Sequence, residues 1–131
     1  MTALPLGLRL YRGLSSSFGP FARLFLLRRV REGKEDRTRL GERRGESTRG
    51  RPAGHLVWLH GASVGEVLSL LPLVEELTRQ GVSVIVTSGT ITSAQVLEHR
   101  LPPSALHQFV PLDLPHYVER FLRHRHPDLI L

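Results

Sequence analysis

The sequence predicts an α/β fold built on a parallel sheet, and three features of its pattern indicate this. Short apolar runs rich in β-branched residues alternate with longer segments in which apolar residues recur at helical spacing. Turns rich in glycine, proline and hydroxyl side chains separate these runs. Strands that alternate with helices at this spacing form parallel sheets with right-handed crossovers, so the expected architecture is Rossmann-like.

Composition and charge limit what the chain can be. Its 131 residues are enough for one domain with a buried core, and the lack of cysteine excludes disulfides and thiolate metal sites. The histidines show no spacing typical of a metal site. Residues 1–52 contain 13 Lys and Arg against 5 Asp and Glu, whereas residues 53–131 contain 5 against 7. The basic character therefore belongs to the N-terminal part.

Residues 1–30 are expected to form an arm that associates with a membrane surface. Apolar residues recur there at helical spacing, with arginines between them. The centre of this stripe is Leu14, Phe18, Phe21 and Phe25. Gly19-Pro20 should interrupt a single helix, and no apolar run is long enough for a regular transmembrane span. The pattern favours a helix on an anionic bilayer surface. The alternative is a helix that packs on this domain, or on a missing domain, with its arginines in water.

Residues 31–52 form a polar, charged segment that composition alone would describe as a linker or a basic patch. We expect no nucleic-acid binding, because no aromatic residue is interleaved for stacking and no binding motif is visible. Glu42 lies between Gly41 and the pair Arg43-Arg44. A single glutamate in such a run is usually a solvated charge.

Residues 53–131 supply the sheet and its helices. Strands are expected at residues 56–59, 82–87, 107–110 and 128–131. The first helix should end at Gly81 and contain Pro72, which removes one backbone hydrogen bond or kinks the helix. Its inward face is expected to consist of Val64, Val67, Leu68, Leu71, Val74 and Leu77. Two further helices are expected, one through residues 94–97 and one over residues 116–124.

The turn after the first strand carries the strongest local signals. Ser63 and Glu66 stand three apart before an apolar periodic segment, which predicts a capping box. Free N–H groups and the helix dipole at this point can bind an anion or a sugar hydroxyl, although any βα unit needs a small-residue turn and a cap. The turns after the next two strands should lie at the same edge of the sheet, where such folds bind ligands.

Five motifs occur in the order and spacing of one family. They are Gly33-Lys34-Glu35, residues 39–45 (Arg-Leu-Gly-Glu-Arg-Arg-Gly), residues 58–66 ending in Ser-Val-Gly-Glu, residues 87–92 (Thr-Ser-Gly-Thr-Ile-Thr), and residues 111–115 (Pro-Leu-Asp-Leu-Pro). Together they resemble the N-terminal half of the 3-deoxy-D-manno-octulosonic acid (Kdo) transferases. Gly89 and Ser93 depart from the family pattern, and the chain ends before the family's acidic-Trp-Pro-Asn segment and its second domain.

The resemblance implies an inverting, metal-independent glycosyltransferase of the two-domain GT-B type that needs no cofactor. Such an enzyme transfers Kdo from CMP-Kdo to the lipid A precursor at the cytoplasmic face of the inner membrane, in lipopolysaccharide core biosynthesis. The missing C-terminal domain would bind the donor, so we expect this chain alone to transfer no Kdo. Glu42 matches the family's general base. The implied acceptor-binding residues are Arg39, Arg43, Ser63, Gly65, Glu66, Thr90 and Thr92.

Two other functions remain open at this point. One is a stand-alone nucleotide- or phosphosugar-binding Rossmann module, although Thr87-Ser88 stands where an acidic residue would favour a dinucleotide. The other is a non-catalytic basic adaptor on a membrane surface. In each case the chain divides into an arm (residues 1–30), a basic segment (residues 31–52) and an α/β domain (residues 53–131).

Overall fold

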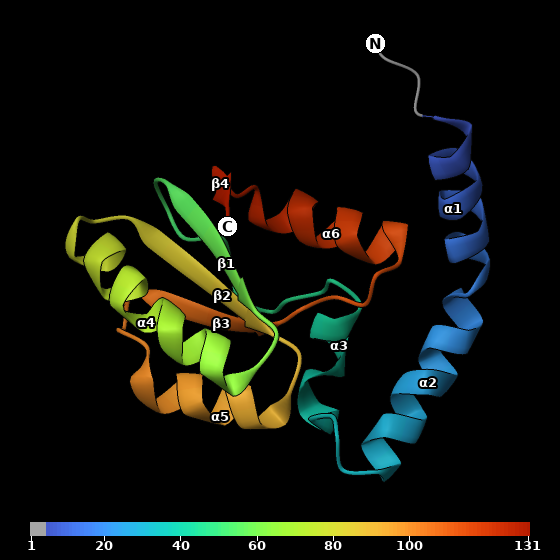
Figure 1. Cartoon of the computed structure of the whole chain (residues 1–131), viewed down its shortest axis with the longest axis horizontal. Helices are drawn as coiled ribbons and strands as arrows, with labels where there is room; N and C mark the ends of the chain where they lie inside the picture. The colour runs from blue at the N-terminus through green and yellow to red at the C-terminus, as the bar shows by residue number, and fades with distance from the viewer. Residues whose placement is uncertain (1–4) are drawn as a thin grey trace.

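The computed structural model describes residues 5–131, apart from the side chains of residues 15 and 16. The first four residues of the expected membrane-associating arm lie outside this range. In chain order the elements are α1 (Leu6–Ser17), α2 (Gly19–Arg31), the 3₁₀ turn η1 (Arg37–Arg39), α3 (Leu40–Arg43), β1 (Leu56–Gly61), α4 (Val64–Arg79), β2 (Ser83–Ser88), α5 (Ile91–Arg100), β3 (Ala105–Phe109), α6 (Pro115–Arg125) and β4 (Leu129–Ile130). Figure 1 shows α1 and α2 standing beside the sheet domain.

The four strands form one parallel sheet in the order β3-β2-β1-β4, which confirms the predicted α/β architecture. β1 and β2 pair along six residues, from Leu56 opposite Ser83 to Gly61 opposite Ser88. Helices α4 and α5 cover one face, and α6 covers the other (Figure 1). β3 lies at the outside of the sheet, and no described strand pairs with its second edge.

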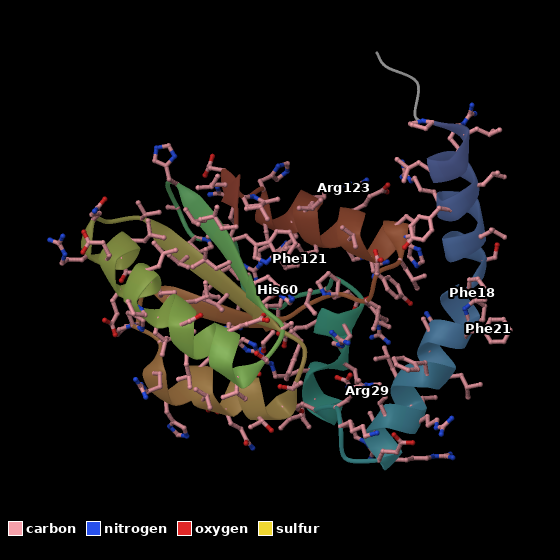
Figure 2. All side chains as sticks on the ribbon, viewed as in Figure 1. Phe18, Phe21, Arg29, His60, Phe121 and Arg123 are labelled. Carbon is pink, nitrogen blue, oxygen red and sulfur yellow. The ribbon has the colours of Figure 1, made fainter. Side chains whose placement is uncertain are left out.

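Alternate strand residues build the two halves of the core, as the pleat of a strand requires. The larger half lies under α4 and α5 and contains Val57, Leu59, Val84, Val86, Val67, Leu71, Val74 and Leu97. On the other face Phe121 of α6 packs against Leu56 and Ile85, and Figure 2 shows it between α6 and β1. Burying each such side chain contributes about 1.5–3 kcal/mol relative to leaving it in water.

All four strands differ from the predicted ranges by one or two residues at their ends, and β1 and β3 differ most. β1 runs two residues further, to Gly61, because its pairing with β2 continues to Ser88. A Cβ at Gly61 would lie 2.6 Å from Val67 Cγ1, so glycine allows α4 to approach the end of the strand. β3 begins two residues earlier than predicted. The Ala105 N–H donates to the Pro102 carbonyl at 3.0 Å, and the chain enters the strand directly from the proline turn.

Helix α4 corrects one predicted inward position. Leu68 is 39% exposed, because it lies to one side of the buried stripe that Val67, Leu71 and Val74 form. The helix continues through Pro72, which lies on its exposed side.

The N-terminal arm packs on the domain through a narrow strip. As Gly19-Pro20 predicts, two helices replace one, with the break at Phe18. Ala22 and Leu26 are the buried residues of α2, and Ala22 lies against Leu114 and Tyr117. Along this strip α2 therefore packs on the domain, which is the alternative to a helix on a membrane surface.

Outside this strip, the arm exposes large apolar side chains to solvent, which together we call the apolar ridge: Leu6, Leu10, Leu14, Phe18, Phe21, Leu24, Phe25 and Leu27. Phe21 and Leu24 are each 65% exposed, and Figure 2 shows Phe21 projecting from α2 away from the sheet. Among the described residues, no helix has the length and apolar character needed to cross a membrane.

The basic segment is folded against the sheet domain and is not a linker. It contains η1 and α3, and it buries Glu35, Arg43 and Gly45. Gly45 has a φ of 78°, and a Cβ there would lie 2.1 Å from the Tyr117 carbonyl oxygen. Glycine thus permits direct contact between the segment and the backbone of α6.

Gly45→Ala should destabilise the chain by about 2–5 kcal/mol. The added methyl group meets backbone, which typically costs about 1–3 kcal/mol, in addition to roughly 1–2 kcal/mol for a positive φ. Gly54→Ala is the matched control, since Gly54 has the same φ and no atom lies within 4 Å of the place that its methyl group would take. Urea unfolding of both variants measures the difference. Equal destabilisation would contradict the close packing of the segment on α6.

Candidate functional site

A cavity of about 880 Å³ lies beside the free edge of β3, between the basic segment and α5. The basic segment supplies the polar wall, which includes Arg39, Glu42 and Arg49. Leu97 and Leu101 belong to the apolar wall. Two residues expected at the site from the sequence, Arg39 and Glu42, therefore face one cavity.

Side chains of the basic segment bind the free edge of β3. The Phe109 N–H donates to Glu42 Oε1 at 3.0 Å. Arg39 Nη2 donates to the His107 carbonyl at 3.3 Å, and Arg49 Nη2 donates to the same oxygen. Backbone groups at a strand edge need partners, and here these side chains take the place of a neighbouring strand.

Arg39 fixes the orientation of Glu42. Its Nε lies 2.5 Å from Oε2 and its Nη2 lies 2.6 Å from Oε1, which is the bidentate geometry of a strong charge-assisted pair. The same guanidinium stacks over the Phe109 ring at 4.6 Å. The Glu42 side chain is only 13% exposed, so its carboxylate is held at the cavity wall in one position.

His107 extends this network into the protein interior. Its Nδ1 lies 3.1 Å from Arg39 Nη2, and because a guanidinium only donates, Nδ1 must accept. The ring proton is then on Nε2, which donates to Ser88 Oγ at 2.8 Å. Burial, followed by the charges of Arg39 and Arg49, lowers the pKa of His107 to about 3. The ring is therefore neutral near pH 7. It links Ser88 to Arg39, which in turn holds the Glu42 carboxylate.

Arg43 points away from the cavity, unlike Arg39. Its guanidinium is buried, donates to the Val110 carbonyl and lies 3.4 Å from Glu35. Arg29 of α2 donates to the same carboxylate at 2.8 Å. The Leu112 N–H donates to the Arg43 carbonyl at 2.8 Å. Arg43 thus joins α2, the basic segment and the turn after β3, and its binding to an acceptor remains a prediction that these contacts do not favour.

The turn after β1 contains the predicted capping box. Ser63 Oγ accepts the Glu66 N–H at 3.2 Å. The Glu66 carboxylate reaches back to the Ala62 N–H at 2.6 Å, one residue before the position at which a capping box normally closes. Both side chains are thus engaged in starting α4.

The turn after β2 is organised in a similar way. Thr90 Oγ1 accepts the Ser93 N–H at 3.1 Å and donates to Ser93 Oγ at 2.7 Å. Gly65 and Thr92 are exposed in the first turns of α4 and α5. Neither turn contributes to the wall of the cavity beside Glu42. The expected site residues therefore form two groups, one at the outer edge of β3 and one at the carboxyl ends of β1 and β2.

Sequence reasoning missed a buried arginine that supports the site. Arg125 is fully buried, and both its Nε and its Nη2 donate to Gln108 Oε1, at 3.1 and 2.9 Å. It also donates to Ser47 Oγ at 2.8 Å and to the Gly50 carbonyl at 3.1 Å. These contacts join α6 to the basic segment. The one signal in the sequence is that Arg125 follows Phe121 by four residues, which places both side chains on the same face of a helix.

The geometry suits proton transfer at a hydroxyl group. A carboxylate held in one position on a cavity wall can accept a proton from a bound hydroxyl, provided that the hydroxyl lies within hydrogen-bond reach. In the described part of the chain, no three His, Asp or Glu side chains gather as they would around a metal ion.

The buried neutral His107 should make stability depend on pH between about 6 and 4. Its folded-state pKa lies below the ordinary 6.5, so the unfolded chain binds one more proton in this range. The free energy of unfolding therefore decreases as the pH decreases. The slope should approach about 1.4 kcal/mol per pH unit. His107→Gln, which cannot titrate, should lose this contribution in urea unfolding. Parallel pH profiles of the two proteins would contradict the assignment.

The residues that build the sheet and the cavity wall are also the part of the chain that resembles known proteins. A family model described as 3-deoxy-D-manno-octulosonic-acid transferase (kdotransferase) matches residues 38–131. A probable mitochondrial 3-deoxy-D-manno-octulosonic acid transferase of Arabidopsis thaliana is 34% identical over 125 residues, which cover 94% of this chain and 28% of the relative. The 3-deoxy-D-manno-octulosonic acid transferase of Rickettsia bellii is 36% identical over 124 residues, which cover 93% of this chain and 30% of the relative. The transferase of the same name from Rickettsia prowazekii is 43% identical over 79 residues, which cover 59% of this chain and 17% of the relative.

No solved structure is significantly similar to the chain. The chain spans less than a third of the length of the three relatives. The family model nevertheless covers most of this chain, including Arg39, Glu42 and the whole sheet. The chain therefore belongs to the 3-deoxy-D-manno-octulosonic-acid transferase family.

Proposed function

We propose that this chain is the acceptor-binding, N-terminal part of a GT-B glycosyltransferase that transfers Kdo from CMP-Kdo to a glucosamine hydroxyl of the lipid A precursor. Membership of the family supports the reaction class, and the relatives carry the name of such transferases. We assign donor binding to a second domain outside this chain, since the relatives are more than three times as long as the regions that match.

The observation that carries this proposal is the fixed carboxylate of Glu42 on the cavity wall. In the proposed reaction Glu42 takes the proton of the acceptor hydroxyl as the oxygen attacks the anomeric carbon of Kdo. The bond from that carbon to CMP breaks, and CMP leaves with its electron pair. Arg39 and the Phe109 N–H hold the carboxylate in place, which a general base requires.

The exposed turns are the proposed contact with the second domain and the substrates. Gly65 and Thr92 lie exposed at the start of α4 and α5, beside the caps formed by Ser63, Glu66 and Thr90. Helix N-termini present free N–H groups and positive partial charge, which suit anionic groups and sugar hydroxyls.

Glu42→Gln in a complete transferase that contains this N-terminal part should lower kcat by about two to four orders of magnitude, the usual contribution of general-base catalysis. Gln keeps the size and an oxygen that can accept the Phe109 N–H, but it cannot take the proton. Affinity for the acceptor should change little, because a base acts mainly in the transition state. Steady-state kinetics with CMP-Kdo and the lipid A precursor measure both quantities.

Glu66→Gln is the matched control for this measurement. Gln serves in a capping box as well as Glu, so kcat and acceptor affinity should both stay close to those of the unmodified enzyme if Glu66 acts only as a cap. If Glu66 instead binds a hydroxyl of the acceptor, Glu66→Gln should weaken acceptor affinity. A near-normal kcat for Glu42→Gln would contradict the proposal and leave Glu42 only as a partner of the β3 edge.

We further propose that the arm holds the protein at the anionic surface of the inner membrane, on the cytoplasmic side. The apolar ridge supports this, since each of its members is at least 48% exposed: Leu6, Leu10, Leu14, Phe18, Phe21, Leu24, Phe25 and Leu27. Such a face can enter the boundary between headgroups and acyl chains while neighbouring arginines contact anionic lipid.

Phe21→Ser combined with Leu24→Ser should weaken partitioning onto phosphatidylglycerol vesicles by at least about tenfold, because each apolar side chain contributes about 1.5–3 kcal/mol when it leaves water. Vesicle sedimentation measures this. Leu73→Ser on α4, which replaces an exposed leucine distant in sequence from the arm, is the control. Unchanged partitioning of the double variant would contradict the membrane proposal.

A further inference from the structure

His60 lies at the carboxyl end of β1, on the face of the sheet that α6 covers. Leu56, Trp58 and His60 alternate along this face, and the three side chains change from buried to half-buried to exposed toward the end of the strand. Figure 2 shows His60 beside the end of β1 that leads into α4. This face is therefore open at the edge of the sheet where folds of this kind bind ligands.

A chain of hydrogen bonds determines which nitrogen of the His60 ring carries the proton. Trp58 Nε1 lies 2.8 Å from Thr87 Oγ1, and it must donate because an indole N–H cannot accept. The Thr87 side chain is fully buried, and its other partner in the described chain is His60 Nδ1 at 2.9 Å. A buried hydroxyl hydrogen needs an acceptor, so Thr87 donates to Nδ1. The neutral ring then carries its proton on Nε2.

The Nε2–H group of His60 is left as a donor at this edge. Within the described residues, the His60 ring makes its one hydrogen bond through Nδ1. Neighbouring polar side chains are engaged in the protein, since Ser63, Glu66 and Thr90 form the caps of α4 and α5. A donor that is exposed, oriented and without a protein partner is suited to bind an oxygen atom of a ligand.

We propose that His60 binds the acceptor sugar, with its Nε2–H donating to an oxygen atom of that sugar. The inference rests on the proposed function, in which the substrates lie against the turns after β1 and β2 and a second domain binds the donor. It does not depend on which carboxylate acts as the base. Thr87 and Trp58 are positioning residues, because they act through His60. The Trp58 ring packs against Phe121 with centroids 4.6 Å apart, which holds the first member of the hydrogen-bond chain in place.

Two substitutions separate binding of the acceptor from support of the sheet. Asn carries its amide at the position of Nδ1, so His60→Asn can still accept the Thr87 hydroxyl but lacks the outer donor. Gln carries its amide one bond further out, at the position of Nε2, so His60→Gln can still donate to a ligand. An acceptor-binding role predicts that Gln preserves function better than Asn, and a purely structural role predicts the opposite order.

In a complete transferase that contains this N-terminal part, His60→Asn should raise KM for the lipid A precursor by about three- to tenfold, the usual effect of one lost hydrogen bond. KM for CMP-Kdo should stay unchanged, and His60→Gln should retain most of the acceptor affinity. An unchanged acceptor KM in His60→Asn, a raised KM for CMP-Kdo instead, or a larger defect in His60→Gln than in His60→Asn would each overturn the proposal.

His55→Asn is the matched control for these kinetics. His55 is an exposed histidine directly before β1, at the opposite end of the same strand, with 86% of its side chain exposed. Its substitution should leave both KM values unchanged. An effect on acceptor KM as large as that of His60→Asn would show that the response is not specific to the carboxyl end of β1.

The orientation of the ring can be measured in this chain alone. At about pH 8, where an ordinary histidine is neutral, NMR of the labelled imidazole nitrogens should show the His60 proton on Nε2 and a hydrogen-bonded Nδ1. Thr87→Val, which removes the hydroxyl donor, should abolish the hydrogen-bond shift of Nδ1. A proton on Nδ1 in the unmodified chain would overturn the proposal.

Failure of this inference is separate from failure of the proposed function. A complete, unmodified transferase that transfers no Kdo would contradict the proposed function, whatever the His60 variants do. Transfer by that enzyme together with an unchanged acceptor KM in His60→Asn would remove the assignment of His60 alone.

Discussion

The unpaired edge of β3 is the constraint on which the site depends. A parallel sheet of this order leaves one side of its outer strand with backbone groups that need partners. The basic segment supplies them through Glu42 at the Phe109 N–H and through Arg39 and Arg49 at the His107 carbonyl. Hydrogen bonds to charged groups contribute about 1.5–3 kcal/mol each, so the contact that completes the sheet also fixes the carboxylate. Structure and proposed chemistry thus share one set of atoms.

Helix α6 holds the basic segment on the side opposite the β3 edge. Gly45 allows backbone contact with α6, and Arg125 reaches from the end of that helix to Ser47 and Gly50. The segment is therefore held between the β3 edge and α6, although its composition resembles that of a linker. Its charged residues are internal partners in several cases, and this explains why Arg43 is buried while Arg49 faces the cavity.

Local signals in the sequence were sufficient for the sheet, because hydrophobic period and turn residues act over a few positions. They predicted four parallel strands, the cap at Ser63 and Glu66, and the helix break at Gly19-Pro20. They could not predict how the basic segment folds, since its partners lie 58 to 78 residues away along the chain. Whether a given arginine is buried or exposed depends on such contacts, and residue type alone carries no information about it.

Hydrogen exchange at the Phe109 amide tests the central claim most directly. Glu42 Oε1 accepts this N–H, whereas the next amide, Val110, donates to Ser88 within the sheet and serves as an internal reference. The account predicts that the Phe109 amide is protected in this chain, loses its protection in Glu42→Ala and keeps it in Glu42→Gln, with Val110 protected throughout. A Phe109 amide that exchanges as fast in the unmodified chain as in Glu42→Ala would show that Glu42 is not held at the β3 edge.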